Sequence, residues 1–206
     1  LSARRARVME TLGPDSMLIL WSAPSRTYSL DVSYEYRQDS NLYYLSGITQ
    51  ADTILVLMPG NASRKEILFV RDRDPFREHW NGRILSTEEV GAISGIRTVL
   101  SVAQFDAFAA AMLSRTPSGV VDEAESKAFA SALGTGRAKL AVLLDARSTG
   151  EALGAGAEFA RRARDRFAGF QVIDATPIVT ELRLVKTPYE QKSLIKSLTV
   201  SSDAQM

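Results

Sequence analysis

YEYRQDSNLYYLSG occupies residues 34–47 and leads directly into an apolar run at residues 53–58. Residues 39–41, Asp-Ser-Asn, carry side-chain oxygens that can cap the N–H groups at the start of a helix. A short helix is therefore predicted to begin there, and Gly47 is predicted to end it in the left-handed conformation that glycine adopts without strain. Its inward face is predicted to consist of Leu42, Tyr43 and Leu45. The apolar run then enters a β-sheet.

Patterns of helices and strands alternate along the rest of the chain. Residues 2–12 predict a helix with its arginines on one side and its apolar residues on the other, and Ser86 to Glu89 predict a capped helix start. Further helices are predicted at residues 101–113, 151–167 and 188–206. Short apolar runs predict strands at residues 17–21, 54–58, 66–70, 120–121, 141–144 and 171–174. Residues 23–33 are predicted to be a loop. The alternation predicts an α/β fold in which helices flank a mixed β-sheet.

Composition excludes several classes of protein. The 206 residues are 45% hydrophobic and 24% charged, which is enough apolar material for one good core. The formal charge is +1, so no electrostatic attraction to nucleic acid or to a membrane surface is expected. The sequence has no cysteine, which excludes disulfides and thiolate metal sites. No apolar run approaches the ~20 residues that a membrane-spanning helix needs. A cytoplasmic location is therefore the expectation.

Residues 36–47, YRQDSNLYYLSG, resemble the FRQ(D/N)S(D/N)FxYLTG signature of the creatinase-like N-terminal domain in the aminopeptidase P family. Two further segments resemble motifs of that family and follow in the same order. Residues 71–83 are similar to its RxRD…xWxGRR segment, and residues 182–191 are similar to the LRxxKSPxEI segment that opens its catalytic domain. Each motif alone is weak. Three in order, over roughly residues 5–205, identify the chain as a member of the family.

The resemblance implies two parts. Residues 1–175 would form the creatinase-like N-terminal domain, and residues 176–206 the linker and first helix of a truncated pita-bread metallopeptidase domain. The family hydrolyses the peptide bond before a penultimate proline. Its two divalent cations, manganese being the expected metal, are held in the later domain by two aspartates, a histidine and two glutamates. His79, the one histidine here, lies where the family has no metal ligand.

These implications give the chain the role of a substrate-shaping and oligomerisation domain. No catalytic residue, metal ligand or cofactor is expected in this segment alone. The expected partners are its own catalytic domain, further copies of the chain and proline-containing peptides, with neither nucleic acid nor membrane.

The resemblance also points to residues of a substrate pocket, contributed in trans. Trp80 matches the tryptophan that reaches toward a neighbouring subunit's active site, and Asp31 matches an aspartate that shapes the substrate end of that cleft. From the residues alone two alternatives stay open: Trp80 as a buried interface anchor, and Asp31 as a turn carboxylate that accepts backbone N–H groups. Five residues belong to the structural motifs: Arg37, Asp39, Gly47, Arg71 and Asp74. Arg37 and Asp39 are expected to form an ion pair or a cap.

Other functions also remain open. A Ser-His-Asp arrangement around His79 is conceivable, although the sequence lacks a G-x-S-x-G elbow. Gly150, Gly154 and Gly156 resemble a phosphate loop only superficially, because no G-K-[ST] follows and they lie in or at the start of a helical pattern. The chain could instead be a stand-alone interaction domain, or part of a relative with proline dipeptidase or creatinase activity.

Overall fold

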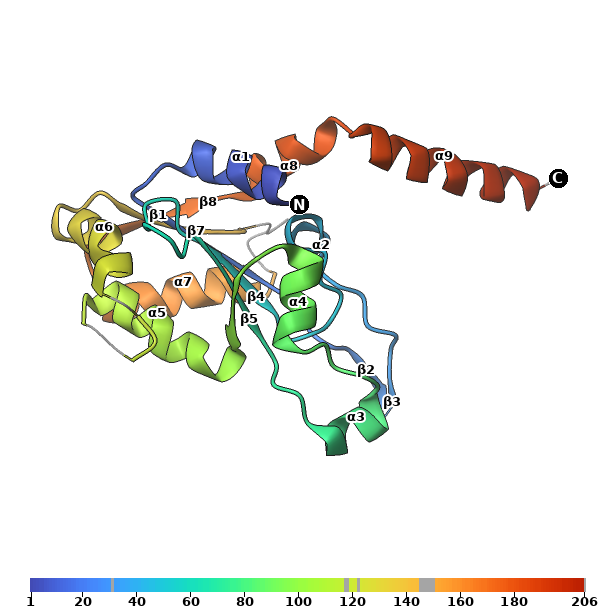
Figure 1. The fold of residues 1–206 in the computed structure, drawn as a ribbon, viewed down its shortest axis with the longest axis horizontal. Coiled ribbons are helices and arrows are strands. Elements are labelled where there is room, and N and C mark those ends of the chain that lie inside the picture. Colours follow the sequence, from blue (N-terminus) through green and yellow to red (C-terminus); the bar gives the residue numbers. More distant parts are fainter. Residues whose placement is uncertain (31, 117–118, 122, 145–150, 206) are drawn as a thin grey trace.

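A mixed six-stranded sheet lies at the centre of the fold (Figure 1). The structure, a computed structural model, describes residues 1–30, 32–116, 119–121, 123–144 and 151–205. The strands of the sheet are β1 (Ser16–Trp21), β4 (Ile54–Leu57), β5 (Glu66–Val70), β6 (Thr98–Ser101), β7 (Ala138–Val142) and β8 (Phe170–Asp174). Their order is β6-β5-β4-β1-β7-β8. β4 is antiparallel to both of its neighbours, and the other pairs are parallel.

Helices cover both faces of this sheet. Side chains alternate along a strand, so in β1 Met17 and Ile19 enter one apolar cluster while Leu18 and Leu20 enter the other. The first cluster includes residues of α5 (Phe105–Ser114), α6 (Glu123–Gly134) and α7 (Ala155–Arg166). The second includes residues of α1 (Ser2–Leu12), α2 (Ser40–Ser46), α4 (Thr87–Ser94) and α8 (Thr176–Leu184). The predicted fold class, a mixed sheet flanked by helices, is confirmed.

The signature at residues 36–47 forms α2 and its caps. Asp39 is the N-cap: its carboxylate accepts hydrogen bonds from the backbone N–H of Asn41 and Leu42, both at 2.9 Å. Gly47 ends the helix in the left-handed conformation, with φ of 74°. Leu42 and Leu45 are fully buried, as predicted. Tyr43 was expected to face inward, but this prediction is wrong, since its side chain is 51% exposed. One face of so short a helix meets the sheet, and Tyr43 lies outside that face.

One other helix starts where the sequence predicts it, and one starts four residues later than predicted. Ser86 and Glu89 form a capping box, in which the Glu89 N–H donates to the Ser86 hydroxyl and the Ser86 N–H donates to the Glu89 carboxylate. The helix predicted at residues 151–167 is α7. It begins at Ala155, because Gly154 is its N-cap, and Gly156 lies in its first turn. Gly150 lies outside the described residues.

Several elements differ from the sequence prediction. Val120-Val121, predicted as a strand, is not one: Val121 forms only an isolated bridge, and both valines pack near Phe108. Two apolar residues are too short a run to become a strand of this sheet. Conversely, the predicted loop at residues 23–33 contains two short strands, β2 (Thr27–Ser29) and β3 (Val32–Ser33). The sequence prediction also missed two short helices, α3 (Pro75–Asn81) and α8.

The arginines of α1 do not all lie on the solvent side, which corrects the prediction for this helix. Arg5 is completely buried and donates hydrogen bonds to the carbonyls of Leu45, at 2.8 Å, and Ser94, at 3.0 Å. Its guanidinium also pairs with Glu66 at 3.0 Å. The two carbonyls belong to the last turns of α2 and α4, where helices have acceptors without intrahelical donors. Arg5 therefore joins the C-terminal ends of two helices to Glu66, the first residue of β5.

The last helix, α9 (Pro188–Asp203), extends away from the sheet (Figure 1). All its residues are described and none is buried. Several of its apolar side chains are exposed, namely Tyr189, Leu194, Ile195, Leu198 and Val200. By contrast, α8 packs on α1 and buries Val179. The domain boundary predicted between residues 175 and 176 stays a prediction.

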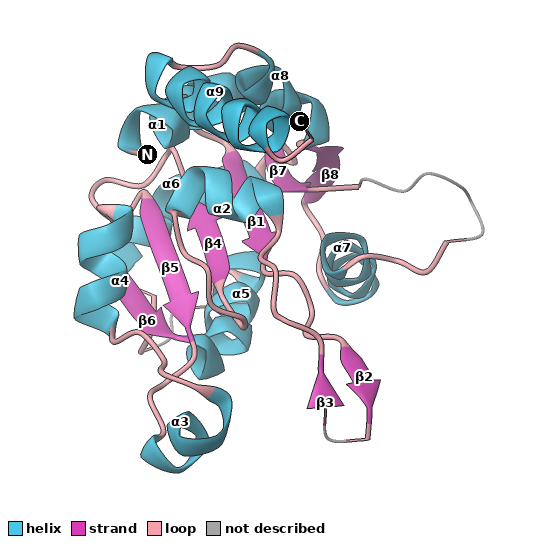
Figure 2. Ribbon diagram, turned by 90° about the vertical axis from the view of Figure 1, so that its right-hand side faces the viewer, coloured by secondary structure: helices cyan, strands magenta, loops and turns pink. Residues whose placement is uncertain are grey.

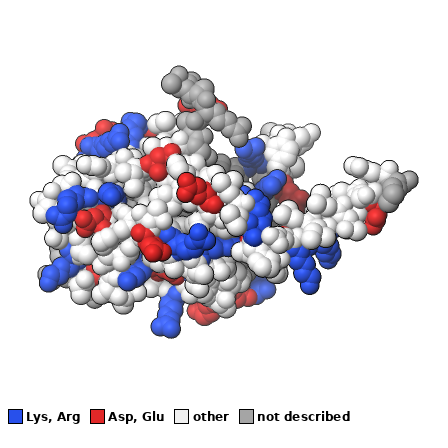
Figure 3. Space-filling model, turned by 90° about the horizontal axis from the view of Figure 1, so that it is seen from above, with Lys and Arg blue, Asp and Glu red and all other residues white. Residues whose placement is uncertain are grey.

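The surface carries both signs of charge. In Figure 3, lysine and arginine side chains lie among aspartates and glutamates rather than in a separate patch. Among the described residues, no helix combines the length and apolar character that a bilayer crossing requires.

Candidate functional site

An exposed apolar hairpin projects from one end of the molecule (Figure 2). Its strands, β2 and β3, are antiparallel and form a separate two-stranded sheet. We call residues 27–34 the arm. Its large side chains are exposed: Tyr28, Leu30, Val32 and Tyr34. The rings of Tyr28 and Tyr34 pack edge to face, with centroids 5.2 Å apart. Contiguous apolar surface of this kind, turned to solvent, is typical of an interaction site.

Gln38 fixes the base of the arm. Its side-chain oxygen accepts hydrogen bonds from the backbone N–H of Ala23, at 3.1 Å, and of Asp39, at 2.8 Å. Its amide nitrogen donates to the Gln50 carbonyl at 2.8 Å. The amide of Gln38 thus joins the chain entering the arm, the start of α2 and the loop before β4.

Tyr36 strengthens the same junction. Its hydroxyl lies 3.1 Å from the Ala23 carbonyl and 2.9 Å from the Gln38 side-chain oxygen, so it can donate to either. Burial raises the pKa of the Tyr36 phenol, and the nearby carboxylates of Asp52 and Asp39 raise it further. The phenol therefore keeps its proton, and its role as a donor, at neutral pH.

The helix α3 also projects at this end of the molecule, at the bottom of Figures 1 and 2. The Asp74 carboxylate accepts a hydrogen bond from the Phe76 N–H at 3.0 Å, which supports the first turn. Arg73 forms a bidentate pair with Glu78, with distances of 2.8 and 2.9 Å. The Glu78 carboxylate also accepts from the Ile84 N–H, at 3.1 Å, so it ties the chain after α3 back to the helix.

These contacts shift the titration of Glu78. The hydrogen bonds from Arg73 lower the pKa of its carboxyl to about 2, with further lowering by the Ile84 N–H and the Arg83 charge. Glu78 is therefore ionised throughout the neutral range and acts as a fixed anionic clamp. An acid–base role near pH 7 is not consistent with this pKa.

A second glutamine connects the arm to α3. The Gln50 side-chain oxygen accepts from the Leu85 N–H at 3.0 Å, shortly after α3, while its backbone carbonyl accepts from Gln38. Its side-chain nitrogen is buried and has no hydrogen-bond partner among the described residues. Sequence reasoning missed Gln38 and Gln50 as structural links. The signal was present for Gln38, because a polar amide stands inside the signature itself.

The predicted site residues fall on these two projecting elements. Trp80 lies in the last turn of α3, and its side chain is not among those described. Asp31 lies outside the described residues, between Leu30 and Val32 of the arm. The structure therefore places the backbone of Trp80 at the end of α3.

The residues of the structural motif have mainly architectural contacts. Asp39 caps α2, which is the cap predicted for it, whereas Arg37 is exposed and forms no ion pair among the residues that the structure describes. Arg71 pairs with Asp52, whose φ of 50° puts the loop before β4 in a left-handed conformation. This pair ties the end of β5 to the loop that contains Gln50.

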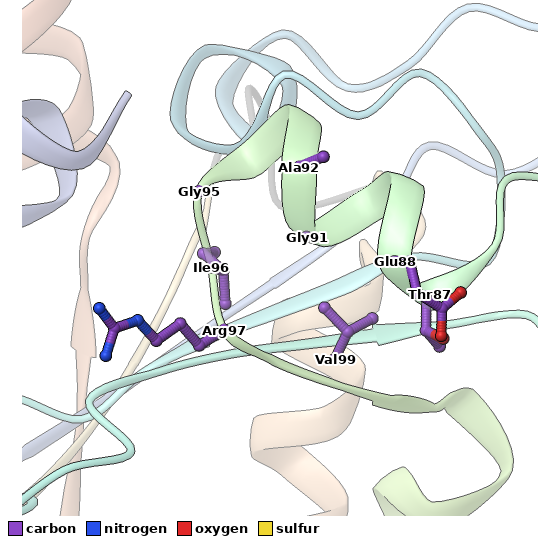
Figure 4. Close-up of a pocket in the computed structure, with 8 residues that line it drawn as sticks. All are labelled: Thr87, Glu88, Gly91, Ala92, Gly95, Ile96, Arg97 and Val99. Atoms are coloured by element: carbon purple, nitrogen blue, oxygen red, sulfur yellow. The ribbon is translucent and has the colours of Figure 1, made fainter.

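A surface hollow of about 480 Å³ lies elsewhere, between α4 and the edge strand β6 (Figure 4). Its lining includes the small residues Gly91 and Ala92 of α4, Gly95 at the end of that helix, and Val99 of β6. Figure 4 shows Arg97 extending away from it. No residue of α3 or of the arm lines this hollow, so it is separate from the predicted site.

A bound metal ion needs several carboxylate or imidazole ligands close together. Within the described ranges, no group of three or more histidine, aspartate or glutamate side chains could hold one. His79 is exposed on α3.

Comparisons with known proteins give the family. A family model for the aminopeptidase P N-terminal domain matches residues 1–121. An Xaa-Pro aminopeptidase of Haemophilus influenzae is 35% identical over 102 residues, which are 50% of this chain and 24% of that protein. The Xaa-Pro aminopeptidase 3 of Homo sapiens is 38% identical over 97 residues, 45% of this chain and 19% of that protein.

Solved structures extend the likeness. The aminopeptidase PepP of Pseudomonas aeruginosa matches with a TM-score of 0.68 and 25% identity, over 93% of this chain and 39% of that one. An E. coli aminopeptidase P matches with a TM-score of 0.65, over 91% of this chain and 39% of its own length. The chain thus spans about two fifths of these structures, and its aligned part about a quarter or less of the curated relatives. Motifs, fold and family match agree: the chain belongs to the aminopeptidase P N-terminal domain family.

Proposed function

We propose that this chain is the substrate-shaping and oligomerising part of an Xaa-Pro aminopeptidase. The whole enzyme would hydrolyse the peptide bond before a penultimate proline. Its catalytic part would follow α9, in the region that the longer relatives contain and this chain does not. The expected compartment is the cytoplasm, in keeping with the absence of cysteine.

One observation carries the proposal. The arm and α3 project at the same end of the molecule, and they carry Asp31 and Trp80, the two positions that the family resemblance assigns to the substrate cleft. The arm and α3 also carry large, exposed apolar side chains, including Leu30 at 96% and Phe76 at 76% exposure. Covering side chains of this kind with a partner is favourable, because apolar surface is removed from water. A neighbouring subunit's active-site rim would provide that cover.

The last helix supports the link to a following catalytic part. Leu194, Ile195 and Leu198 of α9 lie at helical spacing and are exposed. Helices in proteins gain most of their stability from packing against another element. Because α9 has no buried residue here, it lacks such packing within this chain. The proposal assigns this packing to the catalytic part.

The metal ions of the proposed enzyme do not fit the residues described here. Those residues provide no cluster of carboxylate and histidine ligands. The proposal therefore places the two divalent cations, expected to be manganese, in the catalytic part, and this chain contributes only walls and contacts.

Trp80→Ala in the full-length protein tests the proposal. We expect kcat/KM to fall by about tenfold or more for longer Xaa-Pro peptides, because one wall of the pocket is lost, while metal content stays the same. Ile93→Ala, at an exposed apolar residue of α4, is the matched control and should leave turnover unchanged. Unchanged kinetics in Trp80→Ala would restrict this residue to packing, and a full-length protein that cleaves no Xaa-Pro peptide would remove the peptidase proposal.

A further inference from the structure

The junction between α8 and α9 is tied to the first two helices of the domain. The Tyr44 hydroxyl of α2 donates to the Leu182 carbonyl at 3.0 Å. The Arg183 guanidinium donates to the side-chain oxygen of Asn41, also on α2, at 2.6 Å, and lies 5.9 Å from the Tyr44 ring centroid. Two neighbouring residues at the end of α8 are therefore held by one short helix.

Arg4 of α1 completes this contact. It donates to the Tyr44 carbonyl at 3.0 Å, and its guanidinium carbon lies 4.0 Å from the Tyr44 ring centroid, a cation–π distance. The same guanidinium pairs with the Glu190 carboxylate of α9 at 3.1 Å. Arg4 is thus a direct link between α1, α2 and α9.

Glu190 has a double role in this arrangement. One carboxylate oxygen accepts from the Thr187 N–H at 2.8 Å and from the Thr187 hydroxyl at 2.7 Å, in the capping box that starts α9. The other oxygen faces Arg4. Every other residue of α9 is exposed, so the first turn is where this helix meets the domain. Glu190 therefore fixes the start of α9 and is also the residue of α9 that Arg4 anchors.

We propose that Arg4, Asn41 and Tyr44 form a latch that sets the direction in which α9 leaves the domain. They are positioning residues, since they act through the helix that they hold. If the proposed function holds, on which this consequence rests, the latch would place the catalytic part at a defined distance from the arm and α3. Its four named contacts cross from α1 and α2 to residues 182–190, and each involves a side chain that a single substitution can remove.

Two spin labels measure the direction of α9 without any assumption about activity. Because the sequence has no cysteine, Ser131→Cys on α6 and Ser202→Cys at the end of α9 take the labels specifically. We expect a narrow distance distribution by pulsed electron paramagnetic resonance. Arg4→Gln with Tyr44→Phe should broaden it about twofold, because a helix without tertiary contacts samples many directions.

Controls separate the latch from general loss of structure. Arg7→Gln, at an exposed arginine of the same helix, should keep the narrow distribution. Glu190→Gln retains an oxygen for the Thr187 cap but loses the charge that Arg4 pairs with, so it should broaden the distribution with unchanged helix content. An unchanged distribution in both latch variants would overturn the proposal.

The full-length protein tests the consequence for substrate. We expect Arg4→Gln with Tyr44→Phe to lower kcat/KM for longer Xaa-Pro peptides about fivefold, with metal content and turnover of Xaa-Pro dipeptides preserved, because misplacement of the wall affects only the longer substrates. If the double variant cleaves both longer peptides and dipeptides as fast as the unsubstituted protein, the positioning role is overturned. If the full-length protein cleaves neither substrate, the proposed function fails, while the spin-label distances still test the latch.

Discussion

Arg5→Met is the substitution with the sharpest structural prediction. The methionine keeps an apolar stem of similar length inside the domain and removes the guanidinium. Two buried backbone carbonyls, of Leu45 and Ser94, then lose their donor. Glu66 also loses its ion-pair partner, although its side chain is 21% exposed and can recruit water. The change therefore affects the C-termini of α2 and α4 at the same time.

The expected magnitude follows from these contacts. Each buried acceptor left without a donor costs about 1–3 kcal/mol, and the loss of one partner of a buried ionic contact costs about 3–5 kcal/mol. Because Glu66 is partly exposed and can recruit water, the ionic cost is discounted. The two carbonyls then account for most of the loss, and we expect the free energy of unfolding to fall by about 2–6 kcal/mol.

Urea unfolding followed by circular dichroism gives the measurement. Arg7→Met, on the exposed side of α1, is the control, and it should change stability by less than about 0.5 kcal/mol. Arg5→Met combined with Glu66→Gln should cost less than the sum of the two single variants, since the pair is then removed as a unit. A loss below about 1 kcal/mol in Arg5→Met would refute the reasoning that this arginine joins two helix ends.

Three further predictions concern the signature and α3. Asp39→Ala should lower the free energy of unfolding by about 1 kcal/mol, and Asp39→Asn should restore most of it, as measured by urea unfolding; equal stability of all three proteins would contradict the cap. NMR titration should find the pKa of Glu78 near 2, and Arg73→Gln should raise it toward 4.5. Since the folded-state pKa is the lower one, the contribution of Glu78 to stability is present above pH 4.5 and is lost as the pH falls toward 2; an unshifted value would contradict the clamp. Gln38→Leu should speed amide hydrogen exchange in residues 23–36 by about tenfold or more, and unchanged exchange would show that the arm does not depend on Gln38.

Local signals in the sequence predicted most of the fold. Helix caps at Asp39, Ser86 and Thr187 lie where their side chains can accept from nearby N–H groups, and these depend on a few neighbouring residues only. The strands β1, β4 and β5 were also predicted, because short apolar runs bounded by turn residues are typical of buried strands.

Tertiary partners explain what the sequence did not predict. Arg5 reads as one more surface arginine, although it stands three and seven residues before Val8 and Leu12 on the buried face of α1. Its carbonyl partners are 40 and 89 residues away in the sequence. The same holds for Gln38 and Gln50, whose value lies in contacts between loops. Periodicity describes the face of one helix and carries no information about acceptors on another element.

The candidate site was predicted through the family motifs more than through physical pattern. Residues 71–83 alternate in charge and gave no helical periodicity, so α3 was missed even though Trp80 was singled out. The arm was missed for a related reason: strands of two and three residues are shorter than a pattern can indicate. Their exposed apolar side chains became visible only in the folded chain.

A cleavage assay tests the central claim most directly. Residues 1–206 and the full-length protein are each incubated with Mn²⁺ and Xaa-Pro peptides, and release of the N-terminal residue is measured. The account predicts release by the full-length protein and none by residues 1–206 alone. Cleavage by the isolated 206 residues, or no cleavage by the full-length protein, would contradict it.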